Sequence, residues 1–132
     1  MDCPPAGAPR TVILVVEANA IVRAMLRRAL QRHGHRVLVA ANAESAVALF
    51  EHADEPIGLV ITEQRLSGMD GSHLADELRR RDPTVPILLV ATTFDGPSSG
   101  YPQLEKPFTL EKLEQRIAEV LALPPRRYAL RR

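Results

Sequence analysis

The sequence predicts an α/β domain built on an open parallel sheet with helices on both faces. Short β-branched apolar runs alternate with segments whose apolar residues recur at helical spacing, and the alternation continues to the last helix. The runs are almost continuously apolar, as in strands buried on both faces. Strand–helix repetition of this kind favours parallel strands joined by helical crossovers. The length of 132 residues suits a single domain.

The individual elements follow from the same two patterns. The expected strands are Thr11–Val16, Arg36–Ala40, Gly58–Thr62, Ile87–Val90 and Gln103–Glu105. The expected helices are Ile21–Leu30, Glu44–Glu51, Ser72–Arg80 and Leu110–Leu121. Asn42 and Thr109 stand where N-caps are needed, since their side chains accept bonds from unpaired backbone N–H groups. Gly34 suits the residue just beyond the first helix.

Composition excludes several classes of protein. Lysine and arginine number 17 against 16 acids, so the formal net charge is only +1 and gives no bulk reason to expect nucleic acid as the main partner. The single cysteine, Cys3, excludes a disulfide framework. No apolar run reaches the roughly 18–20 residues that span a bilayer. The first residues do not resemble a secretory signal, so we expect a soluble, cytoplasmic protein with no membrane partner.

The chain divides into one domain and two tails. Residues 1–10 contain no periodic apolar pattern and are expected to be a flexible tail, followed by the domain over 11–122. Residues 123–132 form a tail rich in proline and arginine, with four arginines between Arg126 and Arg132. Three roles are open for those arginines: they stay solvated, they dock on an acidic partner, or they bind nucleic-acid phosphates.

Charged residues follow three of the predicted strands at the point where each strand ends. Glu17 follows the first strand, Glu63 the third and Lys106 the fifth, while Ala91 follows the fourth. In open parallel sheets the functional crevice lies beyond the carboxyl ends of the strands. The sequence therefore predicts a cluster of two glutamates and a lysine at one edge of the sheet.

Four segments resemble the receiver domain of two-component response regulators. They are ILVVEANAIVRAMLRRAL, GLVITEQRLSGMDG, VPILLVAT and LEKPF. The resemblance implies a flavodoxin-like, doubly wound sheet of five parallel strands in the order 2-1-3-4-5. It also implies a cytoplasmic bacterial signalling domain that receives a phosphoryl group from a histidine kinase in a phosphorelay.

The resemblance implies two acids for Mg²⁺ after the first strand and a phosphoacceptor aspartate after the third. This sequence has Glu17 at the first acid position and Ala18 at the second, where no carboxylate is available. Glu63 stands at the phosphoacceptor position. Any Mg²⁺ binding through Glu17 and Glu63 is therefore expected to be weak or absent, and we expect no cofactor.

The resemblance also implies a switch serine or threonine, a switch aromatic residue and a lysine. Ala91 stands at the first of these positions and Gln103 at the second, so the hydroxyl and the ring are both missing. Lys106 matches the expected lysine. These departures predict a stand-alone, atypical receiver that acts as a phosphorylation-independent protein-interaction module. With no phosphate loop or nucleophile elbow in the sequence, we do not expect an enzyme.

Glu63 has two interpretations. It forms a standing ion pair with Lys106 that mimics part of the phosphorylated state, or it is a replacement tolerated after phosphorylation was lost. Arg65, two residues later, either reaches Glu17 or Glu63 in place of the metal or stays solvated. Two other functions remain open: a conventional phosphoacceptor that uses Glu63, and a nucleic-acid-binding accessory protein that acts through the C-terminal arginines.

The segment between the fourth and fifth strands is short for a receiver. Pro97 and Pro102 leave little room for a regular helix, so the fourth helix of the family is expected to be shortened or missing. Its loss is expected to expose apolar surface of the sheet, which would favour a partner or a homodimer. The expected partner is a histidine kinase or another regulator of a two-component pathway.

Overall fold

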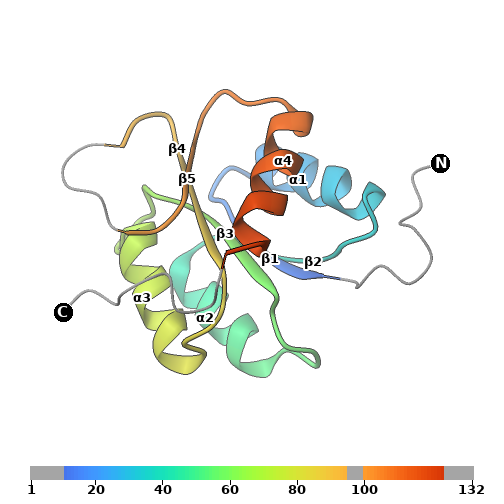
Figure 1. The fold of residues 1–132 in the computed structure, drawn as a ribbon. Coiled ribbons are helices and arrows are strands. Elements are labelled where there is room, and N and C mark those ends of the chain that lie inside the picture. Colours follow the sequence, from blue (N-terminus) through green and yellow to red (C-terminus); the bar gives the residue numbers. More distant parts are fainter. Residues whose placement is uncertain (1–10, 95–99, 124–132) are drawn as a thin grey trace.

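The structure, a computed structural model, describes residues 11–94 and 100–123 (Figure 1). The strands are β1 (Val12–Val16), β2 (Arg36–Ala40), β3 (Leu59–Glu63), β4 (Ile87–Ala91) and β5 (Gln103–Glu105). The helices are α1 (Ala20–Arg32), α2 (Ala43–His52), α3 (Gly71–Arg81) and α4 (Leu110–Leu121). The predicted tails, apart from Leu123, lie outside the described residues.

The five strands form one parallel sheet in the order β2-β1-β3-β4-β5, which confirms the predicted order. Boundaries differ from the predicted ones by at most two residues, and those of β2, β5 and α4 are the predicted ones. The largest consequence is at β3, which continues through Glu63 because that residue is still in register with Val90 of β4. The side chain of Glu63 therefore starts from the sheet itself rather than from a loop.

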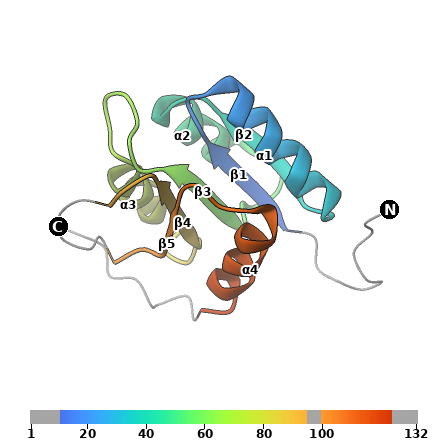
Figure 2. The ribbon, with the colours of Figure 1, turned by 90° about the horizontal axis from the view of Figure 1, so that it is seen from above.

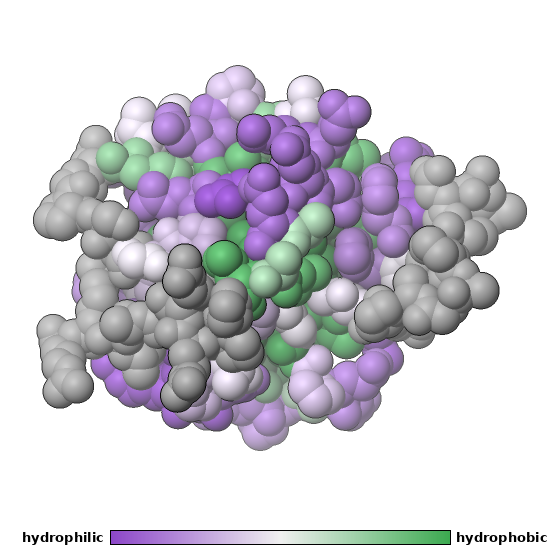
Figure 3. Space-filling view, viewed as in Figure 1, coloured by the Kyte–Doolittle hydropathy of each residue, from purple (hydrophilic) through white to green (hydrophobic). Residues whose placement is uncertain are grey.

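Helices cover both faces of the sheet. Figures 1 and 2 show α1 and α4 on one face and α2 and α3 on the other. Each face has its own apolar cluster, since successive side chains of a strand point to opposite faces. On the face drawn in Figure 3 the surface over α4 is mainly hydrophilic, with some hydrophobic atoms among the hydrophilic ones. No helix in the described ranges is long and apolar enough to cross a membrane.

The capping residues predicted at the ends of the helices are confirmed. The Asn42 side chain accepts from Ser45 N at 2.8 Å and the Thr109 hydroxyl accepts from Lys112 N at 3.0 Å, so both caps are confirmed. Gly34 has a φ of +87°, the left-handed conformation that favours glycine after a helix. These contacts fix where the crossovers turn back onto the sheet.

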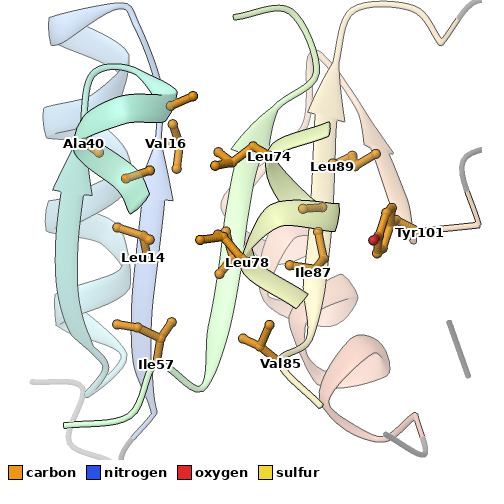
Figure 4. Packing of buried hydrophobic residues seen from close by; sticks show 14 of the residues in the cluster. Leu14, Val16, Ala40, Ile57, Leu74, Leu78, Val85, Ile87, Leu89 and Tyr101 are labelled. Carbon is orange, nitrogen blue, oxygen red and sulfur yellow. The ribbon is translucent and has the colours of Figure 1, made fainter. Parts of the chain in front are cut away.

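The connection from β4 to β5 contains no helix in its described residues, 92–94 and 100–102, as predicted. The predicted exposure of apolar sheet surface is wrong for the described residues. Tyr101 is 4% exposed and joins the cluster between the sheet and α2–α3, and Figure 4 shows its ring beside Ile87 and Leu89. Both of those side chains are completely buried.

The alternation of β5 explains why no helix is needed there. Leu104 packs into the cluster on the α1–α4 face of the sheet. Gln103 and Glu105 therefore point to the opposite face, where Gln103 is half-buried and Glu105 is exposed. The edge strand presents polar side chains to that face, and both Tyr101 and Phe94 of the connection pack against the cluster that contains Ile87 and Leu89 of β4.

Candidate functional site

The carboxyl edge of the sheet holds the predicted cluster of Glu17, Glu63 and Lys106. The Lys106 ammonium donates to Glu63 Oε1 at 2.6 Å and to Glu17 Oε1 at 3.3 Å. Three strands that are distant in sequence supply these side chains, because β1, β3 and β5 all end at this edge. We call this group the acidic–lysine triad.

Glu17 is held by the turn between β1 and α1. Its Oε2 accepts from Asn19 N at 3.0 Å, while the Asn19 side chain caps α1 by accepting from Ile21 N and Val22 N. The backbone N–H of Glu17 donates to Ala40 O at 3.0 Å, which extends the pairing with β2. The residue is only 4% exposed, so its carboxylate depends on these protein donors instead of water.

Arg23 fixes the same turn from α1. Its Nη1 donates to the carbonyl oxygen of Glu17 at 2.8 Å and to that of Ala18 at 3.3 Å. Sequence reasoning missed this contact, since a helical periodicity assigns Arg23 only to a polar face. Its position one turn into α1, just beyond Asn19, was the available signal.

Glu63 and the turn after β3 are positioned by Gly71. The Gly71 N–H donates to Gln64 O at 2.8 Å, and a Cβ at this residue would overlap the carbonyl oxygen of Glu63. The GMDG segment therefore needs glycine for close approach of α3 to the end of β3. Ser72 N also donates to the Gln64 side chain at 3.1 Å, which closes the turn.

Lys106 is placed by the β4–β5 pairing. Its backbone N–H donates to Ala91 O at 2.8 Å, and its side chain reaches across toward β3 and β1. Ala91, at the predicted switch position, is 3% exposed and presents only a methyl group beside this site. Ala18, the other predicted metal position, is exposed on the β1–α1 turn.

Electrostatics of the triad follow from burial and pairing. Burial raises the pKa of the Glu63 carboxyl and the nearby Glu17 charge adds to that rise, while the bond from Lys106 opposes it. The pKa of Lys106 is raised, because its bonds to Glu63 and its attraction to both carboxylates outweigh the cost of burying the ammonium. Two carboxylates thus share one ammonium, which holds Lys106 in its charged form.

The remaining predicted residues of this region are Gln103 and Arg65. Gln103 is at the start of β5, in register with Leu89, and its carbonyl oxygen accepts from Arg116 Nε of α4 at 3.1 Å. Arg65 is exposed on the turn after β3, so its suggested contact with the glutamates stays a prediction. In the described part of the chain, no three His, Cys, Asp or Glu side chains form a cluster suited to a metal ion.

A second buried polar contact was missed by sequence reasoning. The Tyr101 hydroxyl donates to Asp76 Oδ1 of α3 at 2.6 Å, and both residues are 4% exposed. The sequence assigned Tyr101 to a loop and Asp76 to the middle of a helix. The available signal was Asp76 itself, because it directly follows Leu74 and Ala75 on the side of α3 that is buried.

Comparison with known proteins places the chain in a family. The sequence model of the "Response regulator receiver domain" matches residues 13–118. The chain therefore belongs to the response regulator receiver domain family, whose members are signalling modules of two-component systems. The resemblance of the four sequence motifs to this family is confirmed.

Curated relatives and solved structures agree with that assignment. The alkaline phosphatase synthesis transcriptional regulatory protein SphR of Synechococcus elongatus is 36% identical over 95 residues, which is 67% of this chain and 37% of the relative. The transcriptional regulatory protein TcrA of Mycobacterium tuberculosis is 33% identical over 114 residues, 80% of this chain and 44% of TcrA. The chain thus spans less than half the length of these two curated relatives.

Among solved structures, the receiver domain of the hybrid histidine kinase CckA is 30% identical with a TM-score of 0.74, covering 83% of this chain and 98% of that one. The chemotaxis protein CheY4 of Vibrio cholerae is 25% identical with a TM-score of 0.77, covering 85% of this chain and 99% of CheY4. The fold of the present chain is therefore that of a whole receiver domain.

Proposed function

We propose that this chain is an atypical receiver that acts as a protein-interaction module without being phosphorylated. The observation that carries the proposal is the 2.6 Å contact between Lys106 Nζ and Glu63 Oε1. In the family, the equivalent lysine binds an oxygen of the phosphoryl group. Here a carboxylate of the chain itself already occupies that lysine, and Glu17 contacts it as well.

The position of the Glu63 carboxylate supports the proposal. A glutamate extends about one carbon–carbon bond, roughly 1.5 Å, beyond an aspartate. Phosphoryl transfer depends almost entirely on positioning and charge stabilisation, and an error of about 1 Å can reduce a rate about 10²-fold. Glu63 points its longer side chain at Lys106, so its attacking oxygen would first have to leave that ion pair.

The donor set at the site fits Mg²⁺ poorly. Mg²⁺ requires near-octahedral oxygen ligation, in most proteins with one or two carboxylates, several waters and substrate oxygens. Here both carboxylates contact an ammonium group, and the second acid position of the family is Ala18. A cation at this place would compete directly with Lys106.

The residues that report phosphorylation in the family also favour a single standing state. Ala91 has no hydroxyl to bind a phosphoryl oxygen, and Gln103 has no ring to move inward. The Glu63–Lys106 pair thus takes the place of the lysine–phosphoryl contact but has no partner residues that would convert it into a switch. We propose that the domain presents one fixed surface to its partner.

The proposed partner is a protein of a two-component pathway, either a histidine kinase or another regulator. One matched relative is the sensor kinase CckA of Brucella abortus, in which the matched segment makes up only 12% of the protein. Relatives named as transcriptional regulatory proteins carry the domain beside other sequence as well. The domain therefore occurs on both sides of such pathways.

Labelling with radioactive acetyl phosphate in the presence of Mg²⁺ tests the proposal. We expect no labelling of the wild-type chain. The variant Ala18→Asp/Glu63→Asp/Ala91→Thr restores the three family positions and is expected to gain Mg²⁺-dependent labelling. Labelling of the wild type that is lost in Glu63→Gln would overturn the proposal and establish Glu63 as a conventional phosphoacceptor.

A further inference from the structure

The arginines of the described chain fall into two groups. Most of those outside α1 contact a carboxylate, as the following pairs show: Arg36 with Glu55, Arg80 with Glu77, Arg81 with Glu51 and Glu77, and Arg116 with Glu119. On α1 the exposed side chains of Arg27, Arg28 and Arg32 form no ion pair or hydrogen bond with the described residues. Most described arginines outside α1 are therefore paired with a carboxylate, whereas these three arginines of α1 are not.

No acidic residue of α1 offsets this charge. The helix sequence AIVRAMLRRALQR contains four arginines and no aspartate or glutamate. Arginines four residues apart, such as Arg23 and Arg27 or Arg28 and Arg32, are neighbours on a helix surface and repel one another. The helix carries these repulsions without any acidic partner of its own, so an external anion would relieve them.

Three of the arginines lie in one groove. Arg23, Arg27, Arg28 and Gln31 of α1 line it together with Val39 of the edge strand β2, and its volume is about 480 Å³. No carboxylate is among its lining residues. The groove is distinct from the acidic–lysine triad, which it approaches only through Arg23, whose Nη1 holds the carbonyl oxygens of the β1–α1 turn.

We propose that this arginine groove binds a row of phosphate groups. The guanidinium group presents N–H donors in a planar fork that matches phosphate oxygens, and it stays charged at all relevant pH values. At a rise of about 1.5 Å per residue, Arg23 and Arg28 are roughly 7.5 Å apart along the helix axis, so the three guanidinium groups of the groove can face neighbouring phosphates. A helix face of this charge attracts a polyanion without reading its sequence.

The lining favours phosphate chains over an acidic protein. The groove is lined by three guanidinium groups and one amide around the small side chains of Ala20, Ala24 and Val39, which offer little apolar surface for a protein partner to bury. The large apolar side chains exposed on α1, Ile21 and Met25, are not part of its lining. The inference does not depend on the proposed absence of phosphorylation at Glu63.

Fluorescence anisotropy of a short labelled oligothymidylate, titrated with the full chain at low ionic strength, tests the inference. The variant Arg27→Gln/Arg28→Gln is expected to bind about tenfold or more weakly than the wild type. Its salt dependence is expected to flatten by about 1.4 in the slope of log K against log salt concentration, about 0.7 for each lost single-strand phosphate contact. The matched control Arg80→Gln/Arg81→Gln, which removes paired arginines, is expected to bind like the wild type.

Two competitors distinguish the source of the phosphates. Displacement of the oligothymidylate by inorganic tripolyphosphate at equal phosphate concentration would identify free phosphate chains as ligands, and lack of displacement would identify the nucleic-acid backbone. Either result supports a phosphate site. Tighter binding of polyglutamate than of both would overturn it in favour of an acidic protein.

The C-terminal arginines provide the remaining comparison. A full-length chain with the four arginines of residues 126–132 changed to glutamine is expected to keep the binding that depends on α1. The inference is overturned if this tail variant loses binding while Arg27→Gln/Arg28→Gln keeps it. It is also overturned if the wild type does not bind at all.

Discussion

Two polar contacts of this domain involve residues in or next to the β4–β5 connection and β5, and they differ in their exposure to solvent. The acidic–lysine triad joins three strand ends, and its Lys106 side chain is 27% exposed. The Tyr101–Asp76 bond joins the β4–β5 connection to α3, and both residues are almost completely buried. The triad keeps the charged lysine that the family uses for signalling. The Tyr101–Asp76 bond fixes the β4–β5 connection against α3.

If the domain has no phosphorylation switch, as we propose, the comparison indicates where a receiver can lose that switch while keeping its fold. Lys106 and Glu63 are partly exposed at the rim of the sheet, so water screens part of the charge that is left when one of these two partners is replaced. A buried aromatic ring with a charged hydrogen-bond partner has no such screening. Substitutions at the two places should therefore change the free energy of unfolding by different amounts. The pH dependence of these changes should differ as well.

The largest effect is expected at Tyr101. Tyr101→Ala removes a buried ring and leaves a cavity beside Ile87 and Leu89, so the free energy of unfolding should fall by about 3–5 kcal/mol. Tyr101→Phe keeps the ring but removes the donor to Asp76, and should cost about 1.5–3 kcal/mol because the acceptor is a carboxylate. Urea unfolding of both variants measures this; no loss for Tyr101→Phe would contradict the role of the hydroxyl, and equal losses for the two variants would contradict the role of the ring.

A smaller but still clear effect is expected at Lys106. Lys106→Met leaves Glu17 and Glu63 facing each other without a cation, which should cost about 1–3 kcal/mol at neutral pH, less than for a fully buried pair because the site is partly open. The pKa of Glu63 should rise further. Since the protonated carboxyl no longer repels Glu17, the loss should shrink as the pH is lowered toward 5, and a pH-independent loss would contradict the account.

The smallest effect on stability is expected for Glu63→Gln. The pKa of Glu63 is raised in the folded chain. The contribution of this residue to stability is therefore full below a pH of about 4.5, and it is lost as the pH rises through the raised pKa. The amide avoids that loss but removes the best partner of Lys106, so the net change near pH 7 should be below about 1 kcal/mol. A control, Glu77→Gln, disrupts exposed pairs only and should be similarly small.

The same variant has a distinct effect on Lys106. The pKa of Lys106 is raised above 10.5, so its contribution to stability is full below that pH and lost as the pH rises through the raised pKa. Removal of the Glu63 charge should lower the pKa of Lys106, because Glu17 then remains as its only carboxylate partner in the triad. An NMR titration of the lysine side chain measures this, and an unchanged pKa would show that Glu63 does not hold the ammonium.

Much of the fold and the triad was predictable from sequence for a physical reason. Buried parallel strands need continuous apolar runs, and the residue after each run lies at one edge of the sheet, which placed Glu17, Glu63 and Lys106 together. The Tyr101–Asp76 bond was not predictable in this way. It joins residues 25 positions apart, and no local pattern records which helix a loop side chain will meet.

The central claim is that the acidic–lysine triad is a complete, standing structure that does not accept a phosphoryl group. Amide NMR spectra recorded during addition of Mg²⁺ and then beryllofluoride, which mimics an acyl phosphate, test it most directly. The account predicts a well-dispersed spectrum that does not change at either step. Chemical-shift changes clustered at Glu17, Glu63, Ala91 and Lys106 would contradict it.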